Sequence, residues 1–359
     1  MKLLGITEQI VRFLLLKIRE GDLKSGERLM SEKEMCEFFG VSRKPVRAAF
    51  EYLCQNKIVV SKKGSGYYVC DAADCGEHLL KECEKSYRFG VVLFDNNYFR
   101  DIIEGMNRAA RDFGCELIYL PNHTIEEEYA SIRTLVESRV DGIIISPLRS
   151  GEIYSRENYS FIEQERIPMV MIGKRPSNVI CDSIYCDDVH IAETAVQELF
   201  RAGCDRVIHI TDYNSDEVAI NERSEGYELG VEHYYPDLKA IVLNVRDARY
   251  REKLTLYLKG DGKLGFYLIG TPLVQSFLHE VGEISAKTGK SRRLNKNYFI
   301  VSHGQDDLES VPEGVKVVII PKFKIGYITV RRMLERVGGR LGENRFYSTI
   351  LTQKILEKT

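Results

Sequence analysis

Six cations lie close together between Ser42 and Gly66, and side chains of this kind can bind a polyanion. They are Arg43, Lys44, Arg47, Lys57, Lys62 and Lys63, and Glu51 is the single acid in the same stretch. Clustered cations suit phosphate contact, because each neutralised phosphate releases counterions into the solvent. A solvated basic face without a partner explains the same charge equally well. Charge alone leaves both interpretations open.

Three predicted helices would hold these cations in place. Apolar residues recur at helical spacing from Ile6 to Glu20. Ser31 and Glu34 stand in capping-box positions at the start of a short second helix. A third helix is expected over Arg43 to Gln55, with Pro45 in its first turn, where the missing amide hydrogen is tolerated. Two helices joined by a tight turn predict a helix-turn-helix, whose second helix presents its N-terminal side chains to the major groove.

A small hairpin is predicted to follow the third helix. Residues 58–60 and 67–69 are short β runs, and the turn at 62–66 is basic and rich in glycine. Glycine lets the backbone approach another surface closely. After a helix-turn-helix, this hairpin is typical of the wing of a winged-helix module.

Residues 6–70 resemble the GntR family of bacterial transcription regulators in both order and spacing. The resemblance rests on residues 21–29 (GDLKSGERL), 31–33 (SEK), 41–49 (VSRKPVRAA) and 64–69 (GSGYYV). It implies DNA contacts from Lys33, Ser42, Arg43, Lys44, Pro45, Arg47, Lys63, Gly64, Ser65 and Gly66. Met30 replaces the family's usual Pro, and Lys33 replaces an Arg and so cannot make a planar bidentate contact. A degenerate module used for protein contact is the alternative.

The composition is that of an ordinary globular protein with an uneven charge. The 359 residues are 44% hydrophobic and 29% charged, which predicts two or three domains and excludes disorder as the main state. The net charge is −2 overall, but residues 1–70 hold 13 cations and 8 acids, a net of +5. No apolar run approaches a membrane span, and no signal peptide is recognised, so we expect a cytoplasmic protein without a membrane partner. The nine cysteines are then expected to be reduced.

Residues 71–87 are interpreted as a linker. Cys70, Cys75, His78 and Cys83 are potential zinc ligands, but their spacing contains no C-x-x-C pair. We therefore expect a tether with incidental thiols and no metal, with a zinc site as the alternative.

From residue 88 to 359, strands and helices alternate, which predicts parallel sheets covered by helices on both faces. About 270 residues is long for one such sheet and suggests two lobes. The expected strands are 88–94, 116–120, 140–147, 167–172, 206–210, 264–269 and 298–301, and the expected helices include 99–113, 125–139, 189–201 and 221–234. Ligands of such folds bind at the carboxyl ends of the strands.

This region resembles the sugar-sensing domain of LacI-type regulators, which is similar to periplasmic sugar-binding proteins. The resemblance rests on residues 89–92, 103–106, 140–144, 167–170, 187–188 and 223–227, and it is thin after about residue 235. It implies an α/β architecture of two hinged lobes, covering 88–187 with 309–338 and 188–308 with 339–359. The full fold expected is a winged helix-turn-helix (residues 1–70) followed by a two-lobed, periplasmic-binding-protein-like domain of parallel sheets.

The same resemblance implies a set of effector-binding residues. They are Asp95, Asn96, Tyr98, Ser146, Arg149, Arg223, Thr271, Gln305 and Asp306. The planar guanidinium of Arg223 suits a pair of sugar hydroxyls or a carboxylate. The alternative for Arg223 is a surface cation, and the alternative for residues 95–98 is a solvated turn. Gly270-Thr271-Pro272 stands where the family usually has Asn-Asp, and the chain has no Trp. Both departures put the usual sugar chemistry in doubt.

The sequence predicts a ligand-responsive DNA-binding regulator, namely a dimeric repressor that binds a DNA operator and a small-molecule effector such as a sugar. No cofactor is expected. No G-x-S-x-G or H-E-x-x-H motif occurs, and the P-loop-like Gly289-Lys290-Ser291 lacks its first glycine, so no enzymatic activity is expected. The rival hypothesis is a cytosolic metabolite-binding or enzymatic α/β protein whose N-terminal module is vestigial.

Overall fold

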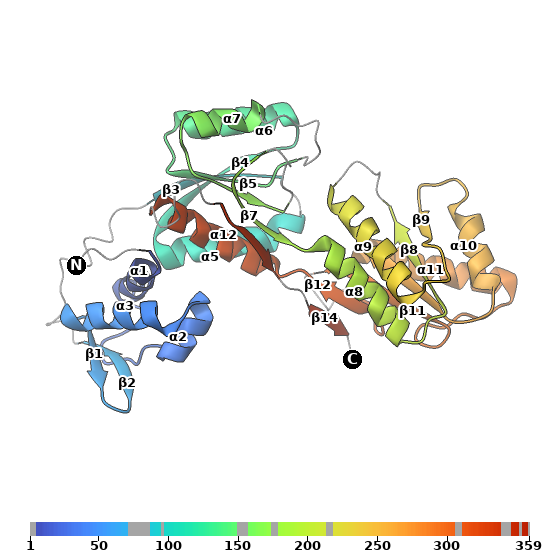
Figure 1. The fold of residues 1–359 in the computed structure, drawn as a ribbon, viewed down its shortest axis with the longest axis horizontal. Helices are drawn as coiled ribbons and strands as arrows, with labels where there is room; N and C mark the ends of the chain where they lie inside the picture. Colours follow the sequence, from blue (N-terminus) through green and yellow to red (C-terminus); the bar gives the residue numbers. More distant parts are fainter. Residues whose placement is uncertain are drawn as a thin grey trace.

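A computed structural model of the chain describes most of its residues. They are 5–70, 87–94, 97–148, 157–173, 179–212, 218–305, 311–338, 346–351 and 354–357. Figure 1 shows these segments as three bodies in a row: an N-terminal domain, a first lobe and a second lobe. Residues 71–86 of the linker predicted at 71–87, including Cys75, His78 and Cys83, lie outside the described part.

The N-terminal domain consists of three helices and a hairpin. Its elements are α1 (Ile6–Arg19), α2 (Glu32–Phe39), α3 (Arg43–Gln55), β1 (Val59–Lys62) and β2 (Gly66–Val69). The predicted capping box is confirmed, because Ser31 and Glu34 each accept a hydrogen bond from the other's backbone. β1 pairs antiparallel with β2 from Val59↔Val69 to Lys62↔Gly66, which forms the wing. The winged helix-turn-helix expected from the sequence is therefore present.

The first lobe is a parallel sheet with helices on both faces. Its strand order is β13-β7-β6-β5-β3-β4. Helices α6 and α7 cover one face, and α5 and α12 cover the other (Figure 1). The bounds are β3 (Tyr87–Leu93), η1 (Asn97–Phe99), α5 (Arg100–Phe113), β4 (Cys115–Pro121), α6 (Ile125–Glu137), β5 (Gly142–Ile145), α7 (Glu157–Gln164), β6 (Met169–Ile172), β7 (Asp182–Cys186), α12 (Lys322–Val337) and β13 (Ser348–Leu351).

The second lobe repeats this architecture with one antiparallel edge. Its strand order is β14-β12-β11-β10-β8-β9. Among the described strands of this sheet, only β14 runs antiparallel to its neighbour. Helices α8 and α9 pack together, as do α10 and α11. The bounds are α8 (Asp188–Arg201), β8 (Arg206–Thr211), α9 (Val218–Tyr234), β9 (Val242–Asn244), α10 (Tyr250–Lys259), β10 (Leu264–Ile269), α11 (Thr271–Thr288), β11 (Tyr298–Gln305), β12 (Lys316–Ile319) and β14 (Lys354–Glu357).

The chain passes between the lobes at three places, and two of them differ from the prediction. The first passage lies between β7 and α8, at Asp187. The return is not near Leu308, because β12 pairs with β11 and so belongs to the second lobe. The last passage is not near Gly338, because β13 pairs with β7 in the first lobe before β14 joins the second. The strands β12, β13 and β14 have four residues each, too short for a periodicity that the sequence could reveal.

Helices α5 and α12 lie in direct backbone contact on the lower face of the first lobe. A Cβ atom on Gly105 would come within 2.0 Å of the Phe323 carbonyl oxygen, and one on Gly326 would come within 1.9 Å of the Ile102 carbonyl oxygen. The N-terminal domain packs against this same pair of helices. Among the described residues, no helix is long and apolar enough to span a membrane.

Candidate functional site

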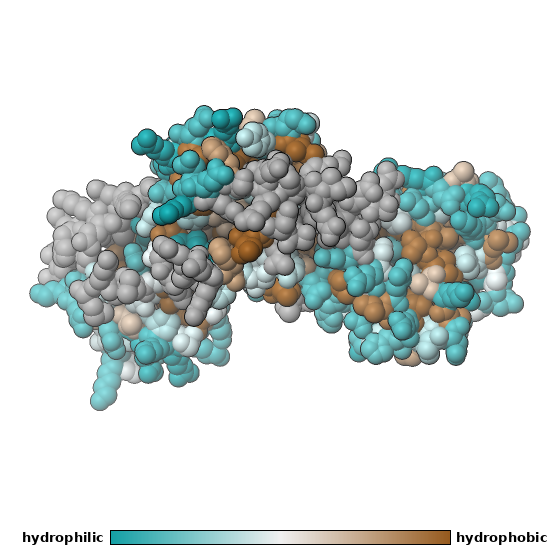
Figure 2. All heavy atoms as spheres, turned by 45° about the horizontal axis from the view of Figure 1, so that its top comes forward, coloured by the Kyte–Doolittle hydropathy of each residue, from teal (hydrophilic) through white to brown (hydrophobic). Residues whose placement is uncertain are grey.

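The recognition helix α3 turns its basic side chains away from the core. Val46, Ala49, Phe50 and Leu53 are buried on one side. Because this stripe fixes the rotation of the helix, the residues between its members face the solvent. Of the predicted DNA contacts in this part of the chain, Lys33, Ser42, Arg43, Lys44 and Arg47 are exposed and Pro45 is partly buried. Figure 2 shows the N-terminal domain, at the lower left, as mostly hydrophilic.

The cations near α3 are engaged only in exposed ion pairs. Arg47 Nε lies 2.9 Å from Glu32 Oε2, with side-chain exposures of 56% and 24%. The hydrogen bond that Arg47 donates to Glu32 raises the pKa of Arg47, so the guanidinium stays charged. Lys33 Nζ lies 3.7 Å from a Glu37 carboxylate oxygen, and both side chains are well exposed. Solvent screening makes such pairs weak, so a phosphate could exchange with either carboxylate.

The wing tip is ordered by its own side chains. The Ser65 and Tyr68 hydroxyls are 2.6 Å apart, and Lys62 Nζ lies 4.4 Å from the centre of the Tyr68 ring. Gly64 has φ = 77°, a conformation that favours glycine. Lys63, Gly64 and Ser65 are exposed, whereas Gly66 is partly buried against the Arg28 side chain. The tip thus exposes the Lys63 side chain and the backbone of Gly64 and Ser65 to the solvent.

A second group of polar residues, which we call the interlobe cluster, contains side chains from both lobes that act on each other electrostatically, Lys322 on His303 and Tyr98 on Arg223. Its members are Tyr98, Asp188, Arg223, Tyr267, His303 and Lys322. Arg223 Nε donates to Asp188 Oδ1 at 2.9 Å, and His303 Nε2 lies 3.8 Å from the same oxygen. From the first lobe, Lys322 Nζ lies 4.2 Å from the centre of the Tyr98 ring.

Burial and opposite charge set the protonation of this cluster. Burial opposes the charge of Arg223, but the Asp188 carboxylate outweighs it, so the pKa of Arg223 is raised. Burial, followed by the charges of Arg223 and Lys322, lowers the pKa of His303 well below its usual value. Burial also lowers the pKa of the neighbouring His209 to about 4. At neutral pH Arg223 is therefore charged and the His303 imidazole is neutral.

Some of the predicted effector residues belong to the cluster and others do not. Tyr98 and Arg223 are members, and Tyr98 is 41% exposed. Ser146 follows β5 directly and is buried, with its carbonyl accepting from Asn122 Nδ2 at 2.9 Å. The backbone of Thr271 begins α11 and that of Gln305 ends β11, while their side chains are not described. Asp95, Asn96, Arg149 and Asp306 lie outside the described residues.

Four members of the interlobe cluster were not anticipated as ligand residues: Asp188, Tyr267, His303 and Lys322. Lys322 is 4% exposed, although nothing in its sequence context distinguishes it from a surface lysine at the start of a helix. It meets Tyr98 because α12 and α5 begin at the same edge of the first lobe. Sequence spacing cannot show this contact, because more than two hundred residues separate the two positions.

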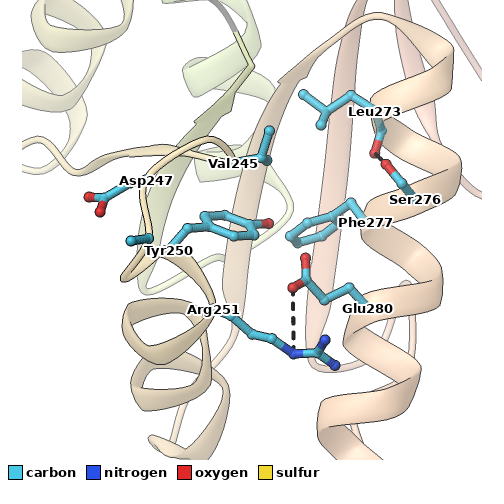
Figure 3. Close-up of a pocket in the computed structure, with 9 residues that line it drawn as sticks. Val245, Asp247, Tyr250, Arg251, Leu273, Ser276, Phe277 and Glu280 are labelled. Atoms are coloured by element: carbon cyan, nitrogen blue, oxygen red, sulfur yellow. Dashed lines mark hydrogen bonds and ion pairs between the residues drawn. The ribbon is translucent and has the colours of Figure 1, made fainter.

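A pocket lies apart from the interlobe cluster, between α10 and α11 (Figure 3). Its volume is about 350 Å³, and none of the predicted effector residues lines it. Its charged groups are paired within the protein: Arg251 contacts Glu280 and Glu283, and Asp247 contacts Lys253. With these groups engaged, the pocket offers little polar chemistry to a ligand.

Comparison with known families decides the identity of both parts. Residues 6–69 match the model of bacterial regulatory proteins of the gntR family. Residues 88–234 match the model of periplasmic binding proteins and the sugar-binding domain of the LacI family. The chain joins a GntR-family domain to a LacI-type domain.

Two similar proteins carry names from sugar metabolism. An arabinose metabolism transcriptional repressor of Halalkalibacterium halodurans is 25% identical over 213 residues, which are 59% of this chain and 56% of the relative. A protein of the same name from Geobacillus stearothermophilus is 24% identical over 230 residues, 63% of this chain and 60% of the relative. The matches thus span between half and two thirds of the relatives' length.

Solved structures share the fold of the LacI-type domain. A LacI family transcriptional regulator from Enterococcus faecium, with bound ribose, aligns with a TM-score of 0.56 at 18% identity, covering 75% of this chain and 97% of that structure. A glucose-galactose binding protein from Geobacillus stearothermophilus aligns with a TM-score of 0.56 at 19% identity, covering 76% and 98%. At this identity the likeness establishes two periplasmic-binding-like lobes and no ligand.

Proposed function

We propose that the protein is a transcription repressor whose affinity for a DNA operator changes when a small metabolite binds between its lobes. The observation that carries the proposal is the presence, in one chain, of an outward-facing basic recognition helix and a cluster of polar side chains contributed by both lobes. The names of the relatives support a role in sugar metabolism.

On this proposal, α3 enters the major groove and the wing follows the DNA backbone. Arg43 and Arg47 are one turn apart on α3 and both are exposed, so they can contact neighbouring bases or phosphates. Lys33, Ser42, Lys44, Pro45 and the wing residues Lys63 to Gly66 would complete the contact. Operators read by such modules have paired half-sites, so we also propose a homodimer.

The proposed effector binds at the interlobe cluster and is a sugar or a related metabolite. The Arg223 fork and the Asp188 carboxylate can hold adjacent hydroxyl groups, and the Tyr98 ring offers a stacking surface. Ser146, Thr271, Gln305 and the predicted residues outside the described part would complete the site. Arabinose is the first compound to test, because two relatives are named for arabinose metabolism.

The curated relatives are transcription regulators, and we propose no enzymatic activity and no cofactor for this chain. The rival function is a metabolite-binding or enzymatic protein with a vestigial N-terminal module. On that view, the exposed cations of α3 and the wing would have no partner, and the basic charge of the domain would serve no purpose.

The test measures duplex DNA binding by fluorescence anisotropy over a range of salt concentrations. The wild type should bind with an affinity that falls steeply with salt, because phosphate contacts release counterions. The double variant Arg43→Ala with Arg47→Ala should lose at least about 30-fold in affinity for a selected operator, at roughly 1–3 kcal/mol per contact. Arabinose-induced thermal stabilisation of the variant should remain unchanged.

A matched control removes two exposed arginines elsewhere, Arg19→Ala with Arg111→Ala. This variant changes net charge equally and should bind the operator nearly as well as the wild type. Equal losses in both variants would mean that overall charge, and not α3, governs binding. A wild type that binds no duplex even at low salt would overturn the proposed DNA-binding function.

A further inference from the structure

The N-terminal domain and the first lobe cap each other's helices. Arg12 of α1 donates through Nε to the carbonyl of Phe113, the last residue of α5, and through Nη2 to the Gly114 carbonyl at 2.8 Å. In the opposite direction, Arg331 of α12 donates through Nη2 to the carbonyl of Phe39, the last residue of α2, at 2.8 Å. A guanidinium at a helix C-terminus satisfies orphan carbonyls and complements the helix dipole. Each domain therefore completes a helix of the other.

A buried carboxylate reinforces the contact. The side chain of Asp112 is 1% exposed, and Lys17 Nζ of the N-terminal domain lies 3.0 Å from its Oδ1 atom. Within the first lobe, Arg108 lies 3.2 Å away and the Tyr327 hydroxyl donates at 3.0 Å. Asp112 thus keeps partners in its own lobe if Lys17 is removed.

Aromatic rings fill the space between these polar contacts. Phe13 and Phe39 of the N-terminal domain each lie 6.2 Å from Phe113, measured between ring centres. Phe38 lies 5.9 Å from Tyr327 of α12. Helix α1 is accordingly buried on two sides, one against its own domain and one against the first lobe. Such packing is typical of a fixed interface.

The two helices that receive the N-terminal domain begin at the interlobe cluster. Lys322 is the first residue of α12, and Tyr98 lies two residues before the start of α5. Arg331 lies nine residues further along α12, about 14 Å at the rise of an α-helix. Because the two backbones touch at Gly105 and Gly326, the helices cannot slide past each other without a clash. A displacement of the first turns of α5 and α12 would therefore also move the surface that contacts the N-terminal domain.

We propose that Arg12, Lys17 and Arg331, which we call the domain latch, hold the DNA-reading domain on the α5–α12 pair and carry the effector signal to it. The latch leaves α3 and the wing exposed, so it orients the reading face and does not cover it. The part of the inference that concerns signalling rests on the proposed function; the docking itself does not.

Docking can be tested by thermal unfolding of the full chain with a local fluorescent probe. The chain has no Trp, so Tyr67→Trp, which places an indole beside Phe50, reports on the N-terminal domain alone. In this background, Arg12→Ala with Arg331→Ala should lower the midpoint of the indole transition by at least about 5 °C, since a loss of 1 kcal/mol shifts a domain of this size by about 4–8 °C. The control Arg19→Ala with Arg111→Ala should leave it within 1–2 °C, roughly the expectation for exposed positions.

Equal midpoints in the latch variant and the control would overturn the docking. If the latch variant does not fold, Lys17→Met replaces it, because Asp112 retains Arg108 and Tyr327 as partners; an unchanged midpoint in Lys17→Met would overturn the proposal in the same way.

Signalling is tested by the ratio of operator affinities with and without arabinose. In the latch variant this ratio should fall to within about twofold of one, while the control keeps the wild-type ratio. A latch variant that retains the full ratio would show that the signal takes another route. A wild type with no response to arabinose would count against the proposed effector, and the thermal experiment would still decide the docking.

Discussion

The N-terminal domain and the second lobe each contain an arginine paired with a carboxylate at 2.9 Å, in opposite surroundings. Arg47 and Glu32 are 56% and 24% exposed, whereas Arg223 and Asp188 are 13% and 14% exposed. Water screens the first pair and competes for both partners, so the pair contributes little to folding. Desolvation makes the second pair costly to break once it is formed. The Arg47–Glu32 pair can therefore exchange its partners for other ions, whereas the Arg223–Asp188 pair is held in position.

The largest predicted effect breaks the buried pair. Arg223→Met should lower the free energy of unfolding of the LacI-type domain by about 3–5 kcal/mol, because the Asp188 carboxylate loses its partner in a desolvated site. Arg47→Met should leave the midpoint of thermal unfolding unchanged while weakening DNA binding. Chemical denaturation of both variants measures the difference, and similar losses of stability would show that burial does not distinguish the pairs.

Glycines provide a second contrast, between the N-terminal domain and the first lobe. Gly326→Ala should cost roughly 2–3 kcal/mol, because the added Cβ would meet backbone atoms of α5 at 1.9 Å. Gly64→Ala in the wing has open space and should cost only about 1 kcal/mol for its positive φ. Denaturant titrations of the two variants test this order. The reverse order would mean that α5 and α12 separate easily.

A lower pH should destabilise the LacI-type domain more than the N-terminal domain. His209 is buried and its pKa is lowered to about 4, so the unfolded chain takes up a proton at a higher pH than the folded chain does. Stability is therefore lost as the pH falls below the ordinary histidine value, by about 2 kcal/mol at pH 5. His303 acts in the same direction. Residues 1–70 contain no histidine, so their stability should change little between pH 7 and pH 5.

Calorimetry between these pH values, with the Tyr67→Trp probe for the N-terminal domain, checks the prediction. His209→Asn, whose side-chain amide can replace Nδ1 as the donor to the Tyr267 carbonyl, should flatten the pH dependence of the LacI-type domain. An unchanged slope in this variant would assign the effect to other groups.

The smallest effect concerns the capping box. Ser31→Ala should destabilise the N-terminal domain by about 1 kcal/mol, because the Glu34 amide loses its acceptor at the start of α2. The pKa of Glu34 is lowered by its hydrogen bond to the Ser31 backbone, so the contribution of Glu34 is present above its ordinary pKa and disappears in acid. Thermal melts of Ser31→Ala and Ser31→Thr at pH 7 test this, and Thr should retain most of the stability.

The N-terminal domain could be predicted almost element by element because its signals are local. The capping box, the Gly40 turn and the glycine-rich wing each lie within a stretch of eleven residues or fewer, and all three are present. For helix α1, the sequence predicted only one of the two buried sides. Its predicted stripe included Ile10 and Phe13, but Leu15 and Leu16 are buried too, because the first lobe covers the other side. The run of three leucines at 14–16 was the available signal.

The LacI-type domain could be predicted in architecture but not in assembly. Its alternating pattern indicated parallel sheets, and the structure has them. The passages between lobes depend on which sheet accepts a four-residue strand, which is a tertiary choice that β12 and β13 do not reveal. Arg223 was predicted as a ligand residue, but its partner Asp188 and the distant Lys322 were not. Their contacts also depend on tertiary packing, which the sequence does not reveal.

The late position of β13 and β14 has a consequence for biosynthesis. Each of these strands forms the edge of a different sheet, so both lobes stay incomplete until residues 348–357 have left the ribosome. Residues 5–70 can fold long before, since all their strand pairing is local. A nascent chain would therefore expose a finished basic domain beside an unfinished sensor, and the Phe39 carbonyl would lack its Arg331 donor until α12, some three hundred residues later, has been made.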